Sequence, residues 1–117
     1  MESNALKVKI RENGEVKIID LKGDFTLFAD KAMNSAVKPL INEGQLKIVI
    51  NFTDVGYINS SGIAILIGLV TLLSNKGGRF KAYGLIPHFQ KVFNMVGLTQ
   101  YMDLFESEEE AISSFDA

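Results

Sequence analysis

Two adjacent serines stand at the start of the most apolar stretch of the chain, in the run Asn59-Ser60-Ser61-Gly62. Serine is a preferred residue at the N-cap of a helix, so one hydroxyl is expected to accept a hydrogen bond from an early helix N–H. The other hydroxyl would lie among unpaired N–H groups, where the positive end of the helix favours an added phosphate. The residues alone leave two interpretations open, a structural cap and a phosphorylation site.

Side chains suited to acid–base catalysis are few. Asp24 and Asp54 fall near the expected carboxyl ends of two strands, but no spacing rule connects them and turn roles are favoured. His88 follows Pro87 in the first turn of an expected helix, which favours a surface position over a general base. A small enzyme using Asp24, Asp54 or His88 is therefore the least favoured class, and no catalytic residue is predicted.

Metal and cofactor chemistry is also not indicated. The chain has no cysteine and a single histidine, which excludes a disulfide framework, a thiolate metal site, a cysteine nucleophile and a histidine-based zinc site. Neither a phosphate-loop pattern nor a dinucleotide-binding fingerprint occurs. We therefore predict no metal and no cofactor.

The elements that must position the two serines begin with a predicted hairpin. Apolar and basic residues alternate over 6–11, the Asn13-Gly14 pair signals a tight turn, and a second apolar run follows over 16–21. The first strand is expected to be an antiparallel edge strand, whose basic residues disfavour further pairing.

The remaining chain alternates between helix-like and strand-like patterns. The first helix is predicted over 28–41, with Phe28 on its apolar face, and Pro39 either kinks this helix or ends it early. The long helix Gly62–Leu73 is apolar almost all round, so it is expected to be the most buried helix. The other predicted elements are a strand at Leu46–Phe52, a loop at Thr53–Ser61, a strand near 80–84, a helix from Pro87 to Gly97, a strand at 102–105 and a helix at 107–115.

This order predicts one α/β domain over residues 1–117. Alternating strands and helices imply a mostly parallel mixed sheet with an antiparallel N-terminal edge strand, covered by about four helices. A length of 117 residues and a composition of 47% hydrophobic and 22% charged residues fit a single globular domain.

Charge limits the classes of partner. Twelve Lys and Arg against fourteen Asp and Glu give a net charge of −2, which argues against a nucleic-acid binder. Six of the acids follow residue 101, where they form either a solvated helix turn or a docking tail. The run Gly62–Leu73 is about eight residues shorter than a membrane helix requires, so we expect a cytoplasmic protein with no membrane insertion.

Three motifs resemble the STAS domain of bacterial anti-sigma factor antagonists. They are Leu21-Lys22-Gly23-Asp24-Phe25, the strand Ile48–Phe52 leading to Val55–Ile63, and Phe93–Leu98. The resemblance covers almost the whole chain. In that family an anti-sigma factor that is itself a serine kinase phosphorylates the serine after the motif's aspartate, a position that corresponds to Ser60. Here the aspartate is replaced by Asn59, and Thr26 stands where a second family acid is expected.

The resemblance implies a regulatory binding protein. The unmodified form would capture a cytoplasmic anti-sigma factor and free a sigma factor, phosphorylation of Ser60 would abolish binding, and a phosphatase would restore it. ATP would be bound by the partner kinase. The expected partner-binding residues lie near the serines and along the exposed side of the helix that follows: Thr26, Tyr57, Ile58, Asn59, Ser60, Ser61 and Gly62.

A second interpretation is a STAS scaffold or accessory subunit, for example in a lipid-transport or signalling complex. It would use the same surface without phosphorylation, and the neutral Asn59 favours it.

Overall fold

In the computed structural model, which describes residues 4–116, β1 (Lys7–Asn13) and β2 (Val16–Phe25) form the predicted antiparallel hairpin. Gly14 turns the chain with a φ of 62°, a conformation that glycine adopts without steric penalty. Strands β3 (Lys47–Ile58), β4 (Arg79–Tyr83) and β5 (Met102–Phe105) then add in sequence order, each parallel to its neighbour. The predicted mixed sheet with an antiparallel edge strand is confirmed.

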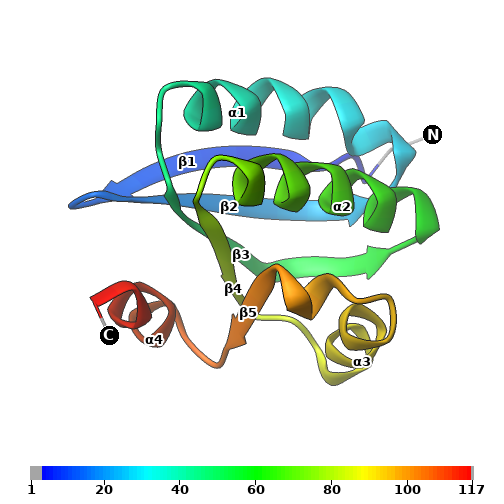
Figure 1. Ribbon diagram of the computed structural model, residues 1–117. Coiled ribbons are helices and arrows are strands. Elements are labelled where there is room, and N and C mark those ends of the chain that lie inside the picture. The colour runs from blue at the N-terminus through cyan, green and yellow to red at the C-terminus, as the bar shows by residue number, and fades with distance from the viewer. Residues whose placement is uncertain (1–3, 117) are drawn as a thin grey trace.

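Helices cover both faces of this sheet. Figure 1 shows α1 (Asp30–Asn42) and α2 (Ser60–Asn75) side by side on one face and α4 (Glu108–Ser113) on the opposite side. α3 (Pro87–Met95) follows β4, and short 3-10 helices η1 (Leu27–Ala29), η2 (Leu98–Gln100) and η3 (Ser114–Asp116) complete the connections. No helix within residues 4–116 has the length and apolar character needed to cross a membrane.

The structure settles one open point about the first helix and corrects another. α1 continues through Pro39 to Asn42, so the proline does not end it early. Phe28 does not lie on its buried face: η1 precedes α1, and the Phe28 side chain is 91% exposed. The three- and four-residue spacing counted Phe28 into an α-helical face, but the tighter 3-10 turn rotates it into solvent.

The predicted loop over Thr53–Ser61 is wrong. β3 extends for twelve residues to Ile58, because β2 pairs beside it with Lys22 opposite Asp54 and Phe25 opposite Ile58. The pairing shifts register twice along this stretch, between Asp20 and Lys22 and again before Asp24. Turn-forming residues such as Gly56 are tolerated in this irregular extension, and they carry the chain directly to the first residue of α2.

The apolar core lies mainly between the sheet and α1, α2 and α3. Phe52 on β3 is fully buried at its centre, with its ring 6.5 Å from that of Phe25 and 5.7 Å from that of Phe93 on α3. α2 contributes six buried residues, more than α1, α3 or α4, as expected from its apolar sequence. This packing fixes the end of β3 and the start of α2 against the end of β2.

A smaller cluster lies beneath α4 on the other face of the sheet, where Val16, Ile18 and Val49 meet Ala111. Polar bonds fix α4 above this cluster. Glu108 accepts hydrogen bonds from Arg11 on β1 (2.6 Å) and from Tyr83 on β4 (2.6 Å). The acidic C-terminal segment is thus partly a docked element and not only a solvated helix turn.

Candidate functional site

The predicted site lies where β2 and β3 end side by side. Phe25 and Ile58 are paired across the two strands, so Thr26 and Asn59 follow at the same edge of the sheet. The backbone N–H of Asn59 donates to the carbonyl of Phe25 at 3.2 Å. This edge lies beyond the carboxyl ends of parallel strands, where α/β sheets place their functional loops.

Asn59, and neither serine, is the N-cap of α2. Its Oδ1 accepts a hydrogen bond from the N–H of Gly62 at 2.9 Å, while its own carbonyl accepts from Ile63 at 3.0 Å. The expectation that a serine hydroxyl caps the helix is therefore wrong. Ser60 occupies the first helical position, one residue later than a cap, because the strand runs on to Ile58.

Ser60 is accessible at the first position of α2. Ser60 is exposed and Ser61 is half-buried, and within residues 4–116 neither hydroxyl has a hydrogen-bond partner. The N–H groups of the first helical turn have no acceptor inside the helix, and within the described part of the chain the side-chain cap accepts from that of Gly62 alone. The first turn also carries no acidic residue. An anionic group attached to Ser60 would therefore lie beside N–H donors at the helix start, which stabilise negative charge.

Gly62 is required by close packing at this edge. A Cβ at this position would lie 2.2 Å from the carbonyl oxygen of Phe25 and 2.8 Å from its ring. The absence of a side chain lets α2 start directly against the end of β2. Gly62 and Ile58, which is 6% exposed, are buried, so these two predicted partner-binding residues position the site and offer no exposed side chain.

Exposed apolar side chains lie at this edge of the sheet, and the sequence analysis missed most of them. Phe28 is 91% exposed, Leu27 is 62% exposed and Tyr57 is 52% exposed. The Thr26 hydroxyl accepts from the N–H of Phe28 at 3.3 Å and so starts η1. Large exposed apolar groups gathered beside a polar centre are typical of protein interaction surfaces. The signal in the sequence was the Leu27-Phe28 pair, which helical spacing assigned to the core.

The carboxylates considered for catalysis do not converge. Asp24 lines a hollow of about 260 Å³ together with Thr26, Phe28 and Asn59, and it accepts a hydrogen bond from Asn4 at 3.0 Å. Asp54 lines a different hollow on the sheet face. His88 is exposed, with its ring centre 5.0 Å from that of Phe89. The three side chains therefore form no common site.

The charges are arranged differently at the start of α4, which also follows a strand and has a side-chain N-cap, Ser107. Hydrogen bonds from Arg11, then from Tyr83, hold the pKa of Glu108 below its ordinary value, and Arg11 likewise lowers the pKa of Asp20. Burial and the bond to Glu108 raise the pKa of Tyr83. The carboxylates of Glu108 and Asp20 are bonded to partners inside the domain, so their role is structural.

The family model for the STAS domain matches residues 7–111. The chain belongs to the STAS domain family. The resemblance drawn from the three motifs is thus confirmed, and the fold described above is the STAS fold.

Several proteins similar to this STAS domain are named anti-sigma factor antagonists. The anti-sigma-B factor antagonist of Bacillus subtilis is 22% identical over 105 residues, which cover 89% of this chain and 94% of that protein. An anti-sigma factor antagonist from Mycobacterium paratuberculosis shares the fold, with a TM-score of 0.84, 17% identity and 97% of each chain covered. SpoIIAA, described as a Bacillus cell fate determinant and solved in its phosphorylated form, gives a TM-score of 0.74 at 26% identity, covering 93% of this chain and 99% of that one.

Proposed function

We propose that this STAS domain is an anti-sigma factor antagonist with no catalysis of its own. It binds a cytoplasmic anti-sigma factor, and so frees a sigma factor for transcription. The observation that carries this proposal is the exposed Ser60 hydroxyl, which has no hydrogen-bond partner within residues 4–116, at an acid-free helix start near exposed apolar side chains. The names of the relatives and the phosphorylated form of SpoIIAA support it.

The proposed contact surface comprises the exposed and half-buried residues near Ser60. Phe28 and Tyr57 are its apolar anchors, because large exposed aromatic groups contribute most of the binding energy when a partner buries them. Thr26, Asn59 and Ser61 form the polar centre between these anchors. Ile58 and Gly62 take part only by holding α2 against β2.

Phosphorylation of Ser60 is the proposed switch. A phosphate adds about −1.5 to −2 charges in the middle of the contact surface. The free N–H groups at the start of α2 stabilise that charge within the domain. A partner surface that packs closely on Ser60 must then accommodate a bulky dianion, so the complex dissociates. The anti-sigma factor supplies the kinase and binds the ATP, and a phosphatase restores the unmodified form.

The neutral residues Asn59 and Thr26 adjust this switch. Both stand where the family pattern has acids, so a phosphate on Ser60 meets less repulsion here. If acids help a kinase orient the serine, Asn59→Asp speeds phosphorylation; if repulsion dominates, it slows phosphorylation. An unchanged rate would mean that Asn59 acts only as the helix cap.

Two experiments test the proposal. A pull-down with the whole chain as bait is expected to capture a protein with a histidine-kinase-like ATPase domain, whereas capture of a membrane permease component would favour the accessory-subunit interpretation. Incubation with that kinase and ATP, followed by mass spectrometry, is expected to place phosphate on Ser60. Phosphate on Ser61, or on neither serine, contradicts the switch. Ser61→Ala is the matched control and should still be phosphorylated.

The apolar anchors have their own test. Phe28→Ala should weaken binding to the captured partner by about tenfold or more, since truncating an anchor residue costs upward of about 1.4 kcal/mol. Met95→Ala is the matched control, because Met95 is also highly exposed, at 83%, but belongs to a different helix, α3. Equal affinities for the two variants would remove Phe28 from the contact surface.

A further inference from the structure

The outer face of α2 is unlike that of an ordinary surface helix. No charged residue occurs between Ser60 and Asn75, although several positions in this span are exposed. Ile67 is 41% exposed, and Gly68 beside it has open space where a Cβ would stand. Exposed helix faces normally carry charged residues, so this face has the composition of a surface that is covered.

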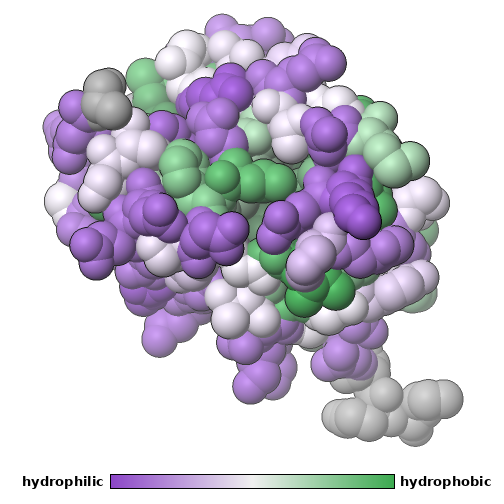
Figure 2. All heavy atoms as spheres, turned by 90° about the horizontal axis from the view of Figure 1, so that it is seen from below, coloured by the Kyte–Doolittle hydropathy of each residue, from purple (hydrophilic) through white to green (hydrophobic). Residues whose placement is uncertain are grey.

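A hollow of about 390 Å³ lies between α1 and α2 along this face, and Figure 1 shows the two helices side by side. Its lining from α2 is small or apolar: Ala64, Ile65, Gly68, Leu69 and Leu72. The side of the molecule that carries α3 and α4 is largely hydrophilic, with small apolar patches near its centre (Figure 2).

The lining from α1 carries an ordered charge pattern. Asp30, Asn34 and Lys38 follow one another at four-residue intervals, so a negative, a neutral and a positive side chain line the hollow in that order. Asp30 and Lys38 are both exposed, and within residues 4–116 neither takes part in an ion pair. They are separated by eight residues, or about 12 Å along the helix.

When two copies of α1 run antiparallel, the negative end of this charge pattern on one copy faces the positive end on the other. A second copy turned about a two-fold axis that crosses the helices near Asn34 places each Asp30 opposite the partner's Lys38. The same rotation lays the uncharged faces of the two α2 helices antiparallel, with Gly68 near the axis. Two-fold contacts of identical surfaces are the commonest form of protein self-association.

We propose that the α1–α2 face, defined by Asp30, Asn34, Lys38, Ile67 and Gly68, binds a second copy of this chain in this antiparallel arrangement. The absence of a side chain at Gly68 lets the two α2 backbones approach, and the two Asp30–Lys38 pairs set the direction. This contact starts one turn after Ser60 and does not depend on the proposed anti-sigma factor.

Sedimentation velocity of the purified chain tests the proposal over a range from about 10 μM to about 1 mM, which covers weak specific association. We expect a monomer–dimer equilibrium that weakens as salt screens the Asp30–Lys38 pairs. Gly68→Arg should raise the dimer dissociation constant by about tenfold or more, because it places two like charges near the axis. The matched control is Ser35→Arg at an exposed position of α1 outside the hollow.

Charge reversal tests the antiparallel arrangement itself. Asp30→Lys alone and Lys38→Asp alone should each weaken the dimer, and the double variant should recover most of the wild-type affinity. Gly68→Arg has open space around it, so its melting temperature should match that of Ser35→Arg. A wild-type chain that stays monomeric at the highest concentration, a dimer unaffected by Gly68→Arg, or a double variant that fails to recover overturns the proposal.

Discussion

The starts of α2 and α4 share a side-chain N-cap but differ in the charge of their first turns. Each helix follows a strand and has a side-chain cap, Asn59 in α2 and Ser107 in α4. The first turn of α4 then contains three acids, whereas that of α2 contains none. Acidic groups are stabilised at a helix N-terminus, so α4 has filled its positive end with permanent charges.

The partners of these residues show what the difference means. Glu108 at the start of α4 is bonded to Arg11 and Tyr83, and Arg11 is in turn bonded to Asp20 at 2.8 Å. Ser60, at the equivalent first position of α2, has no bonded partner within the described residues. The charges at α4 are bonded to partners inside the domain, whereas under the proposed function the start of α2 receives a charge that is added and removed.

We expect the largest effect on the free energy of unfolding from a substitution at the third helical position. It is Gly62 in α2 and Glu110 in α4. Gly62→Ala should destabilise the domain by about 3 kcal/mol, because its Cβ would overlap the Phe25 carbonyl, which is backbone and cannot move aside cheaply. Chemical denaturation measures this. Gly68→Ala, with open space, should instead be neutral or stabilise by up to about 1 kcal/mol, and a similar loss in both variants would argue against the packing explanation.

Acid should release α4 and leave the start of α2 intact. The lowered pKa values of Glu108 and Asp20 mean that these carboxylates stabilise the fold fully above the unfolded pKa, about 4, and lose that contribution as pH falls through their lower folded values. At pH 7, Glu108→Gln should cost about 1–2 kcal/mol, a modest figure because the partly exposed Arg11 is screened by water.

The pH profile of that variant is the sharper measurement. Thermal melts from pH 7 down to about pH 3 should show a smaller acid-induced loss for Glu108→Gln than for the wild-type chain. Glu109→Gln is the control, because Glu109 is exposed on the same helix turn and should leave the profile unchanged. Identical acid profiles for all three proteins would show that Glu108 does not hold α4 in place.

The capping assignment gives the smallest expected effect on stability. Asn59→Ala should cost about 1 kcal/mol, since it removes the acceptor of the Gly62 N–H, whereas Ser60→Ala should cost close to nothing. Asn59→Asp should keep the cap and the stability. Equilibrium unfolding of the three variants decides this point, and a larger loss for Ser60→Ala than for Asn59→Ala would restore the serine as the cap.

Local patterns predicted the fold well because each element carried its own signal. The alternation over 6–11 with Asn13-Gly14 gave the hairpin, and Pro87 and Gly97 bounded α3 and its final turn. The extension of β3 was missed because its stability comes from β2, a strand far away in sequence that pairs with it through Ile58.

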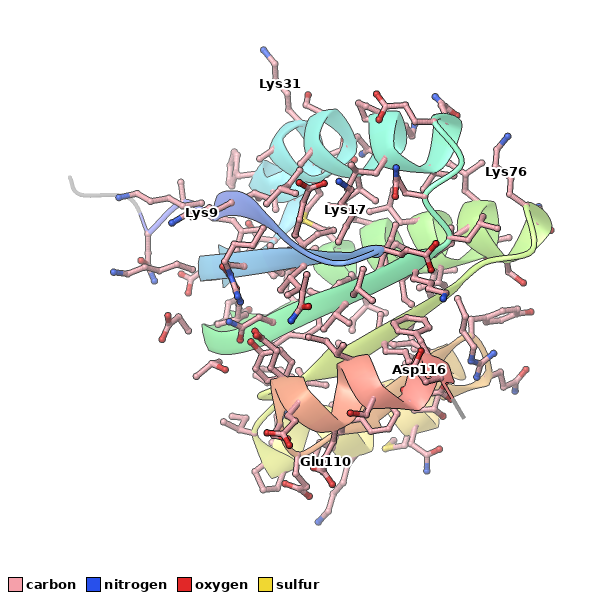
Figure 3. All side chains as sticks on the ribbon, turned by 90° about the vertical axis from the view of Figure 1, so that its left-hand side faces the viewer. Lys9, Lys17, Lys31, Lys76, Glu110 and Asp116 are labelled. Carbon is pink, nitrogen blue, oxygen red and sulfur yellow. The ribbon has the colours of Figure 1, made fainter. Side chains whose placement is uncertain are left out.

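The details of the site depended on that same long-range pairing. Extending β3 to Ile58 moves the cap from serine to Asn59, and the 3-10 turn after Thr26 moves Phe28 from core to surface. Charge counting likewise located the acids after residue 101 but could not show that Glu108 meets Arg11, 97 residues away. In Figure 3 the labelled acids Glu110 and Asp116 lie on the side of α4, and Lys31 and Lys76 lie on the side of α1 and α2.

The most direct test of the account is the affinity of Ser60 variants for the captured anti-sigma factor, measured by titration calorimetry beside thermal melts. Ser60→Ala should bind as the wild-type chain does, and Ser60→Asp should bind at least about tenfold more weakly, a difference of about 1.4 kcal/mol. Both should stay folded, since an acid in the first turn of α2 is favourable. Equal affinity of Ser60→Asp and the wild-type chain would contradict the proposal that the start of α2 is kept open for a switching charge.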